Sequence, residues 1–132
     1  MSRRKSRIIA FQGLYSWDVG GMSKEDILKF DWLDSELDEA DTAFSRMLIA
    51  GTIENVAKID ETIKAHLTNW DFKRVNKVSI AILRMSVYSL LFTKDIDSSI
   101  VIDEAIDIAK NYGPDDSYKF INAILDNIRK SA

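Results

Sequence analysis

The apolar residues of this chain recur at the spacing of α-helices. Positions three and four residues apart are apolar over residues 2–19, 41–58, 76–93 and 100–112, and again in a last segment that begins at residue 115 or 116. Two shorter helices are also predicted, one capped by Ser23 and one capped by Asp60 that ends near residues 69 and 70. No segment is predicted to form a strand, so the pattern indicates an all-α fold of six or seven helices.

The segment 76–93 is apolar on nearly every side, which is typical of a helix at the centre of a bundle or at an interface. Arg84 is the one charge within its middle part, 78–92. We expect Arg84 to form an ion pair with a carboxylate such as Glu104. Replacing Glu104 with alanine should then destabilise the fold, because it leaves a buried cation.

Glycines mark three places where helices end or cross. Gly20 and Gly21 should end the first helix with a left-handed turn, and Gly113 before Pro114 should end the helix 100–112. Gly51 lies inside an apolar helical stripe, where glycine costs about 1 kcal/mol relative to alanine. Its presence there predicts a close crossing of two helices.

The composition is that of a globular protein. A length of 132 residues suits one domain, and 46% hydrophobic with 30% charged residues argues against disorder. The longest apolar stretch, 78–92, is shorter than the ~20 residues of a membrane-spanning helix, and no secretory signal is visible. These features predict a soluble, cytoplasmic protein without a membrane segment.

Charge is distributed unevenly along the chain. Arg3, Arg4, Lys5 and Arg7 are four of the 18 basic residues, and no acidic residue precedes Asp18. The other 14 basic residues face 21 acidic ones, so the formal charge of −3 divides into +4 at the amino-terminal end and −7 elsewhere. Clustered guanidinium groups bind phosphate and stack on bases. The basic end is therefore a candidate nucleic-acid contact, with a solvated terminus as the alternative.

Residues for catalysis or metal binding are scarce. The chain has no cysteine and a single histidine, His66. Asp103, Glu104 and Asp107 lie close together on one predicted helix, but a di-metal site in a helical bundle takes Glu-x-x-His pairs that the chain lacks. We find no phosphate-binding glycine loop, nucleotide-binding motif or catalytic triad. The sequence predicts neither an enzyme nor a cofactor nor a metal ion.

RNA recognition is the function that the remaining features favour. Single-stranded RNA is typically held by cations on its phosphates and by aromatic rings under its bases. Tyr15 in the first helix, and Tyr112 and Phe120 on either side of the Gly113-Pro114 turn, are candidate rings. Each of them alone is more often a core residue, and the case for RNA depends on their combination with the basic end.

Several motifs follow one another in an order that is known from a protein family. They are Arg3-Arg-Lys-Ser-Arg7, Gln12-Gly-Leu-Tyr-Ser-Trp17, Ala81-Ile-Leu-Arg-Met-Ser-Val-Tyr88, Asp103-Glu-Ala-Ile-Asp-Ile-Ala-Lys110 and Lys119-Phe-Ile-Asn122. They resemble the arginine-rich, Q-A-L-Y-x-W, A-I-L-R-x-A-x-Y, N-E-A-I-x-x-A-K and K-F-V-N motifs of the NusB transcription antitermination factors. The resemblance covers nearly the whole chain, and the motifs are specific as a set.

This resemblance implies one all-α domain, 1–132, of two packed three-helix subdomains at about 1–75 and 76–132. It also implies binding of single-stranded boxA RNA, a heterodimer with the ribosomal protein NusE, and action on elongating RNA polymerase at ribosomal RNA operons. By matching positions, the RNA contacts are expected to be Arg3, Arg4, Lys5, Arg7, Tyr15, Tyr112, Asp116 and Phe120. The partner-binding residues are expected to be Ser79, Ile82, Ser86 and Ser89.

The chain departs from the family pattern at several positions. Ser79 and Ser89 replace acids, Asp97 a proline, Asp103 an asparagine and Ala123 a glycine. Because the acids near the start of the central helix belong to the NusE-facing side of the family, Ser79 bears on partner affinity more than on the fold. In the family, the position of His66 often carries an aromatic RNA contact.

Two other functions are compatible with the sequence. The first is the RNA-binding module of an rRNA-modifying system, since some ribosomal-RNA cytosine methyltransferases carry a similar helical module. The second is a helical protein-binding adaptor whose basic end is solvated. The sequence also leaves open whether the chain is a monomer or a homodimer that masks its basic end.

Overall fold

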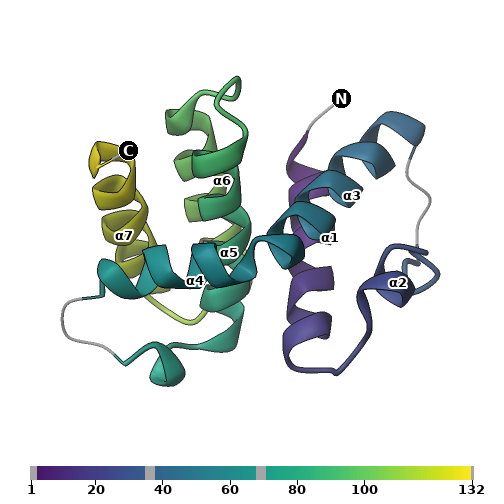
Figure 1. Ribbon diagram of the computed structural model, residues 1–132, viewed down its shortest axis with the longest axis horizontal. Coiled ribbons are helices and arrows are strands. Elements are labelled where there is room, and N and C mark those ends of the chain that lie inside the picture. Colours follow the sequence, from purple (N-terminus) through teal and green to yellow (C-terminus); the bar gives the residue numbers. More distant parts are fainter. Residues whose placement is uncertain (1–2, 35–37, 68–70, 132) are drawn as a thin grey trace.

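The computed structural model describes residues 3–34, 38–67 and 71–131. Within these ranges every regular element is a helix, so the predicted all-α fold is confirmed. In chain order the elements are α1 (Arg3–Asp18), α2 (Lys24–Ile27), α3 (Glu39–Glu54), α4 (Val56–Ala65), the 3-10 turn η1 (Phe72–Arg74), α5 (Lys77–Phe92), α6 (Ser98–Tyr112) and α7 (Ser117–Ser131) (Figure 1). None of these helices is long and apolar enough to cross a membrane.

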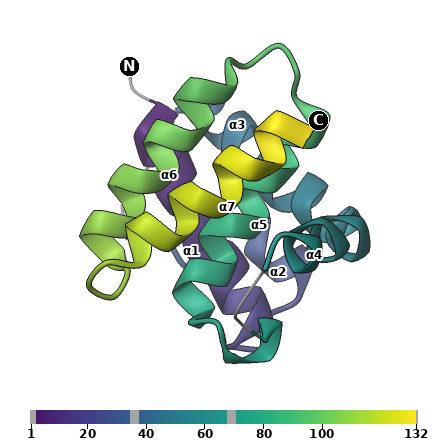
Figure 2. The same ribbon diagram turned by 90° about the vertical axis from the view of Figure 1, so that its left-hand side faces the viewer.

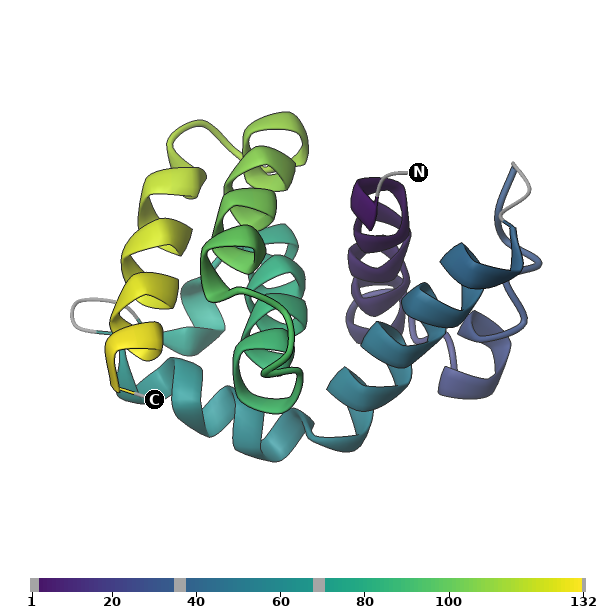
Figure 3. The same ribbon diagram turned by 90° about the horizontal axis from the view of Figure 1, so that it is seen from above.

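Helix α5 lies at the centre of the bundle. Eleven of its 16 residues are buried, and it packs against α1, α3, α4, α6 and α7. Helices α6 and α7 lie over one side of it (Figure 2), and α1, α2 and α3 form the other side of the molecule (Figure 3). Such burial requires apolar residues all round the helix, as the sequence pattern indicated. Helix α4 packs mainly on α5, and the subdomain boundary near residue 75 stays a prediction.

Helices α3 and α4 meet at a break that lies earlier in the chain than the one predicted between residues 58 and 60. Helical backbone stops at Asn55 (φ −114°, ψ 18°), whose side-chain Nδ2 donates to the Gly51 carbonyl oxygen at 2.8 Å. A side chain that bonds the helix backbone competes with the regular hydrogen-bond ladder. Asp60 consequently lies inside α4, and the prediction that it caps a separate helix was wrong. The predicted end of that helix, at Asn69 and Trp70, lies outside the described residues.

The other helix ends fall close to their predicted positions. Helix α6 starts slightly earlier than predicted, because Asp97 Oδ1 accepts a hydrogen bond from the Ser99 backbone N–H at 2.9 Å. The same bond lowers the pKa of the Asp97 carboxyl. Ser23 caps α2 as predicted, and Gly21 has the left-handed φ of 70° that was expected after α1.

Gly51 allows α3 to pass close to α5. A Cβ atom added at Gly51 would lie 2.2 Å from Cζ of Tyr88, a residue of α5. This is far inside van der Waals contact, so the close crossing predicted from the glycine is confirmed. The Tyr88 ring in turn stacks on Phe92, with ring centroids 5.5 Å apart.

Arg84, in the middle of α5, pairs with carboxylates other than the predicted one. Its Nε and Nη2 donate to Asp60 Oδ1 and Oδ2 at 2.9 and 2.8 Å, and its Nη1 lies 3.4 Å from Asp18 Oδ2. These contacts join α5 to α4 and to the end of α1. The prediction of an Arg84–Glu104 pair was wrong, because Glu104 lies on α6 and pairs with Arg4 and Arg7 of α1.

Replacing Asp60 with alanine should destabilise the protein by about 3 kcal/mol, because Arg84 would stay nearly buried without its bidentate partner. The free energy of unfolding from urea titration measures this loss. Arg84→Met in the Asp60→Ala background should recover part of it, since no cation is then buried. A loss below about 0.5 kcal/mol, the range of ordinary surface changes, would contradict this role.

Gly51→Ala should also destabilise the protein. Alanine is favoured over glycine in helices by about 1 kcal/mol, but overpacking against the Tyr88 ring costs roughly 1–3 kcal/mol. In a Tyr88→Ala background the ring is absent, and the same substitution should stabilise. The unfolding free energies of the four proteins check this reversal, and stabilisation in both backgrounds would show that the ring moves aside easily.

Candidate nucleic-acid interface

The basic end of the chain forms the first turns of α1. Because the helix begins at Arg3, the side chains of Arg3, Arg4, Lys5 and Arg7 project from different sides of one rigid element. Arg3, Arg4 and Lys5 are exposed, whereas Arg7 is only 6% exposed. Three of the four predicted cations are thus at the surface, and the fourth is part of the packing.

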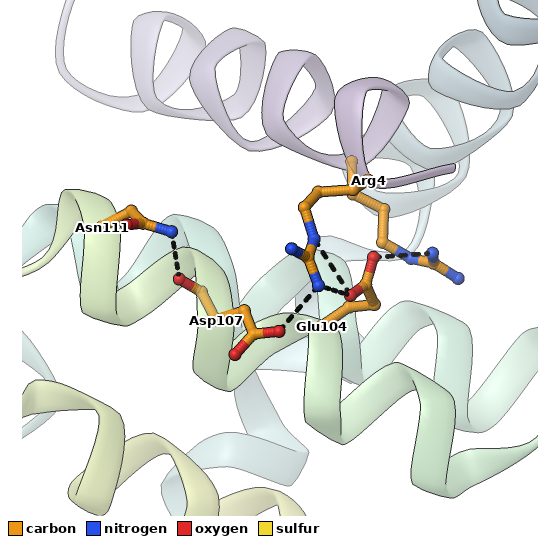
Figure 4. Close-up of polar contacts among 5 residues, drawn as sticks. Arg4, Glu104, Asp107 and Asn111 are labelled. Carbon is orange, nitrogen blue, oxygen red and sulfur yellow. Dashed lines mark hydrogen bonds and ion pairs between the residues drawn. The ribbon is translucent and has the colours of Figure 1, made fainter. Parts of the chain in front are cut away.

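Arg4 bridges α1 to α6 (Figure 4). Its Nε and Nη2 donate to Glu104 Oε2 at 3.2 and 2.7 Å, and Nη2 also donates to Asp107 Oδ2 at 2.7 Å. The hydrogen bond to Glu104 raises the pKa of Arg4. Glu104 and Asp107 are three residues apart on a helix and so lie on one face. The fold therefore supplies the basic end with acidic partners of its own.

Arg3 and Arg7 lie over the ring of Phe44 on α3. Their guanidinium carbons are 4.5 and 5.2 Å from the ring centroid. Arg7 Nη1 lies 3.7 Å from Glu104 Oε1, and Arg3 Nη1 donates to the Ala40 carbonyl oxygen at 3.2 Å. Burial lowers the pKa of Arg7, but an arginine stays protonated at neutral pH. Arg7 therefore holds α1, α3 and α6 together and presents little charge to a ligand.

A hollow of about 600 Å³ lies beside the exposed cations. This α1–α6 hollow is lined by Arg4, Lys5, Ile8, Ile9, Gln12, Trp32, Leu33, Asp34 and Tyr112. Tyr112 is 45% exposed and rests edge-on against Phe11, with ring centroids 5.3 Å apart. One open surface thus combines two of the predicted cations with one predicted ring, the combination that suits a single nucleic-acid strand.

Other predicted contacts gather in a pocket of about 360 Å³ at the turn between α6 and α7. This turn pocket is lined by Arg74, Val75, Asn76, Ser79, Pro114, Asp115, Asp116, Ser117 and Phe120. Asp116 has a positive φ of 66°, which aspartate tolerates better than most residues, and its carboxylate is exposed. The turn begins directly after Tyr112, so it connects the pocket to the α1–α6 hollow.

Some predicted site residues lie elsewhere. Tyr15 is partly buried against the core and lines neither the hollow nor the turn pocket. His66 ends α4, where its Nδ1 lies 2.9 Å from the Thr62 carbonyl oxygen, and it also lines neither surface. Of the predicted partner contacts, Ser79 lines the turn pocket. All four predicted partner contacts are buried in the free protein, Ser79 included, and the three that do not line the pocket are Ile82, Ser86 and Ser89.

The chemical groups of these two surfaces suit binding. Guanidinium and ammonium groups attract phosphate, and phenol rings stack on bases. Glu104 and Asp107, two of the acidic residues of α6 that were compared above with a metal site, both accept hydrogen bonds from Arg4. In the part of the chain that the structure describes, no group of three or more His, Asp or Glu residues is placed to hold a metal ion.

The sequence missed some members of these surfaces. Gln12 and Trp32 line the α1–α6 hollow, and Arg74 lines the turn pocket. Glu104 and Asp107 were not assigned to the basic end. Their spacing on α6 does signal a shared partner, but only the packing of α6 beside α1 identifies that partner as Arg4.

The fold and the two surfaces define an all-helical protein with a basic and aromatic face built on α1 and α6. Comparison with known proteins identifies the family to which the chain belongs. The sequence profile of the NusB family matches residues 4–130. The chain therefore belongs to the NusB family.

Individual relatives agree with this placement. The chain is 51% identical over 134 residues to the transcription antitermination protein NusB of Treponema denticola, covering 100% of this chain and 98% of the relative. Its structure resembles NusB from T. maritima with a TM-score of 0.88 at 36% identity, over 98% of this chain and 92% of that one. It also resembles a chain of the crystal structure of antitermination factors NusB and NusE in complex with dsRNA, with a TM-score of 0.82 at 25% identity over 100% of both chains. Because these relatives are transcription antitermination proteins, the prediction of a non-enzymatic protein is confirmed at the level of the family.

The buried and exposed cations of α1 should respond differently to substitution. Arg7→Ala removes contacts to Phe44 and Glu104 and should lower the melting temperature by roughly 3–6 °C. Lys5 has no ion pair with any described residue, so Lys5→Ala should leave the melting temperature unchanged. Thermal unfolding followed by circular dichroism measures both, and equal shifts would contradict the distinction.

Proposed function

We propose that this protein is an RNA-binding transcription antitermination factor. In this proposal it binds single-stranded boxA RNA together with the ribosomal protein NusE, and acts on elongating RNA polymerase at ribosomal RNA operons in the cytoplasm. The observation that carries the proposal is the α1–α6 hollow, where Arg4, Lys5 and Tyr112 surround one open surface. Membership of the NusB family, and a related complex that contains NusB, NusE and dsRNA, support the choice of partners.

Attraction of the RNA is assigned to the exposed cations of α1. Arg3, Arg4 and Lys5 reach solvent, whereas Arg7 is enclosed. On a single strand, each phosphate contact contributes about −0.7 to the slope of log K against log salt. The expected slope is therefore about −2 for three contacts, instead of about −3 for the four that the sequence suggested.

Selection of bases is assigned to groups further along the same surface. The Tyr112 ring is already held against Phe11, so little side-chain freedom is lost when a base stacks on it. Beyond the turn, the Asp116 carboxylate is able to accept hydrogen bonds from a base edge, and Phe120 lines the pocket beside it. Tyr15, which is partly buried in the core, is expected to contribute least.

NusE is proposed to dock at the start of α5. Ser79 lines the turn pocket there but is itself buried, and a partner seated on the pocket would touch the exposed side chains of Arg74 and Asn76. Ile82, Ser86 and Ser89 are enclosed, so in this proposal they shape the docking surface from beneath. Because the same pocket contains Asp116 and Phe120, bound RNA and NusE would lie next to each other.

Filter binding with boxA RNA tests the proposed function. The protein should bind boxA RNA more tightly than a scrambled strand or a duplex of the same sequence, and more tightly still with NusE present. Light scattering under the same conditions shows whether a homodimer forms and masks α1. Equal affinity for boxA and scrambled RNA, with and without NusE, would indicate attraction to any polyanion and would contradict the proposal.

Two variants separate attraction from selection in that assay. Lys5→Ala should weaken binding of boxA and scrambled RNA equally and reduce the salt slope by about 0.7. Tyr112→Ala should weaken binding of boxA in particular, by the roughly 1–3 kcal/mol of one stacked base, and leave the slope unchanged. Lys58→Ala is the matched control, because Lys58 is an exposed lysine of α4 outside both surfaces.

A further inference from the structure

The cations of α1 are largely balanced by acidic residues of the fold. Arg4 contacts both Glu104 and Asp107, and Arg3 Nη1 lies 3.8 Å from Asp41 Oδ1. Three of the four cations thus pair with three carboxylates, and the seven groups together have a charge of +1 where the sequence alone suggested +4. A polyanion that approaches α1 meets carboxylates as well as guanidinium groups.

The two carboxylates at Arg4 differ in their surroundings. Glu104 has a side chain that is 15% exposed and lies between Arg4 and Arg7, so it belongs to the packing of α6 against α1. The Asp107 side chain is 42% exposed, and its carboxylate pairs with Arg4. Figure 4 shows the Arg4 side chain reaching from α1 to both carboxylates. Asp107 is therefore the acidic group that can change without disturbing the core.

We propose that Asp107 sets the affinity for RNA by competing with phosphate for the Arg4 guanidinium group. This inference rests on the proposed RNA-binding function. Carboxylate and phosphate bind a guanidinium group through the same N–H donors, and Arg4 Nη2 already donates to Asp107 Oδ2 at 2.7 Å. A phosphate that takes this donor must break the bond and then lie beside the released carboxylate, whose charge repels it.

The competing contact lies along the proposed path of the RNA. Arg4 and Tyr112 line the same hollow, and Asp107 precedes Tyr112 on α6. A strand that runs from Arg4 to Tyr112 therefore passes Asp107. The Arg4–Asp107 contact lowers the affinity of polyanions that bind through charge alone. Such polyanions gain no stacking on the Tyr112 ring that would offset this loss. Asp107 thus keeps binding of such polyanions weak.

The substitution Asp107→Asn tests the inference, because asparagine keeps the size of the side chain and an acceptor for Arg4 but removes the charge. It should tighten binding of boxA RNA roughly two- to fivefold at low salt, the range expected for one exposed ion pair. The salt slope should become steeper by less than about 0.7, because Asp107 keeps the Arg4–phosphate contact partial in the wild type and Glu104 still pairs with Arg4 in the variant. Asp103→Asn is the matched control, since Asp103 is exposed on the same helix and has no ion pair with Arg4. It removes the same charge and should change binding less.

A double-mutant cycle locates the effect at Arg4. The gain from Asp107→Asn should vanish in an Arg4→Ala background. An equal gain in both backgrounds, or an equal gain from Asp103→Asn, would overturn the inference, because the effect would then be long-range charge. Weaker binding by Asp107→Asn would also overturn it, since Asp107 would then be a positioning residue that holds Arg4 ready for phosphate.

Elution from heparin distinguishes a failure of this inference from a failure of the proposed function. Heparin is a polyanion without bases, so Asp107→Asn should elute at higher salt than both the wild type and Asp103→Asn. If this elution order is found but the protein does not prefer boxA RNA to scrambled RNA, the result supports competition for Arg4 and contradicts only the proposed function. Identical elution of Asp107→Asn and Asp103→Asn, with boxA selectivity intact, would overturn only the inference. Melting curves show that each variant is folded.

Discussion

The burial of α5 on every side is the constraint on which the rest of the structure depends. A helix that packs against five others cannot carry a charge without a partner, and its central cation, Arg84, is held by Asp60 of α4 and Asp18 at the end of α1. The same burial requires glycine at position 51, where α3 passes the Tyr88 ring. Because Arg84 fixes one end of α1 in the bundle, the opposite, basic end of this helix is carried to a defined place beside α6.

Surface charge follows from packing as much as from composition. The net charge of −3 does not prevent a face for RNA, because at physiological salt charges more than about 8 Å apart are largely screened. What a phosphate meets is the local arrangement, in which Arg7 is enclosed and Arg4 is shared with the carboxylates of α6. The electrostatic attraction that this face exerts on a phosphate is therefore modest. Recognition by such a face must depend on rings and hydrogen bonds that lie beyond the cations.

The helices were predictable because burial imposes a period on the sequence, and that period is local. A break between two helices was predicted near Asp60, but its true position at Asn55 was not predictable, since it depends on a side chain that bonds the helix backbone and leaves the apolar spacing unchanged. Among the predicted RNA contacts, Arg3, Arg4, Lys5 and Tyr112 lie at the surface and Arg7 is enclosed, while their binding of RNA stays a prediction. The partner of Arg84 was assigned wrongly, because the pairing of distant charges depends on which helix faces meet. The spacing of residues within one helix does not indicate which faces of different helices meet.

Helices α1 and α6 touch each other mainly through long side chains. Helix α1 packs on α3 and α5, and it reaches α6 through the ion pairs of Arg4 and Arg7 and the edge contact of Phe11 with Tyr112. Exposed ion pairs contribute only about 0–1 kcal/mol each, far less than the buried surface of α5. The distance between α1 and α6 is set by the packing of both helices on α5, whereas the exposed side chains that line the hollow are held more weakly. A ligand in this hollow would meet a fixed arrangement of helices whose exposed side chains can change rotamer, so the face can fit ligands of different shape while the bundle stays intact.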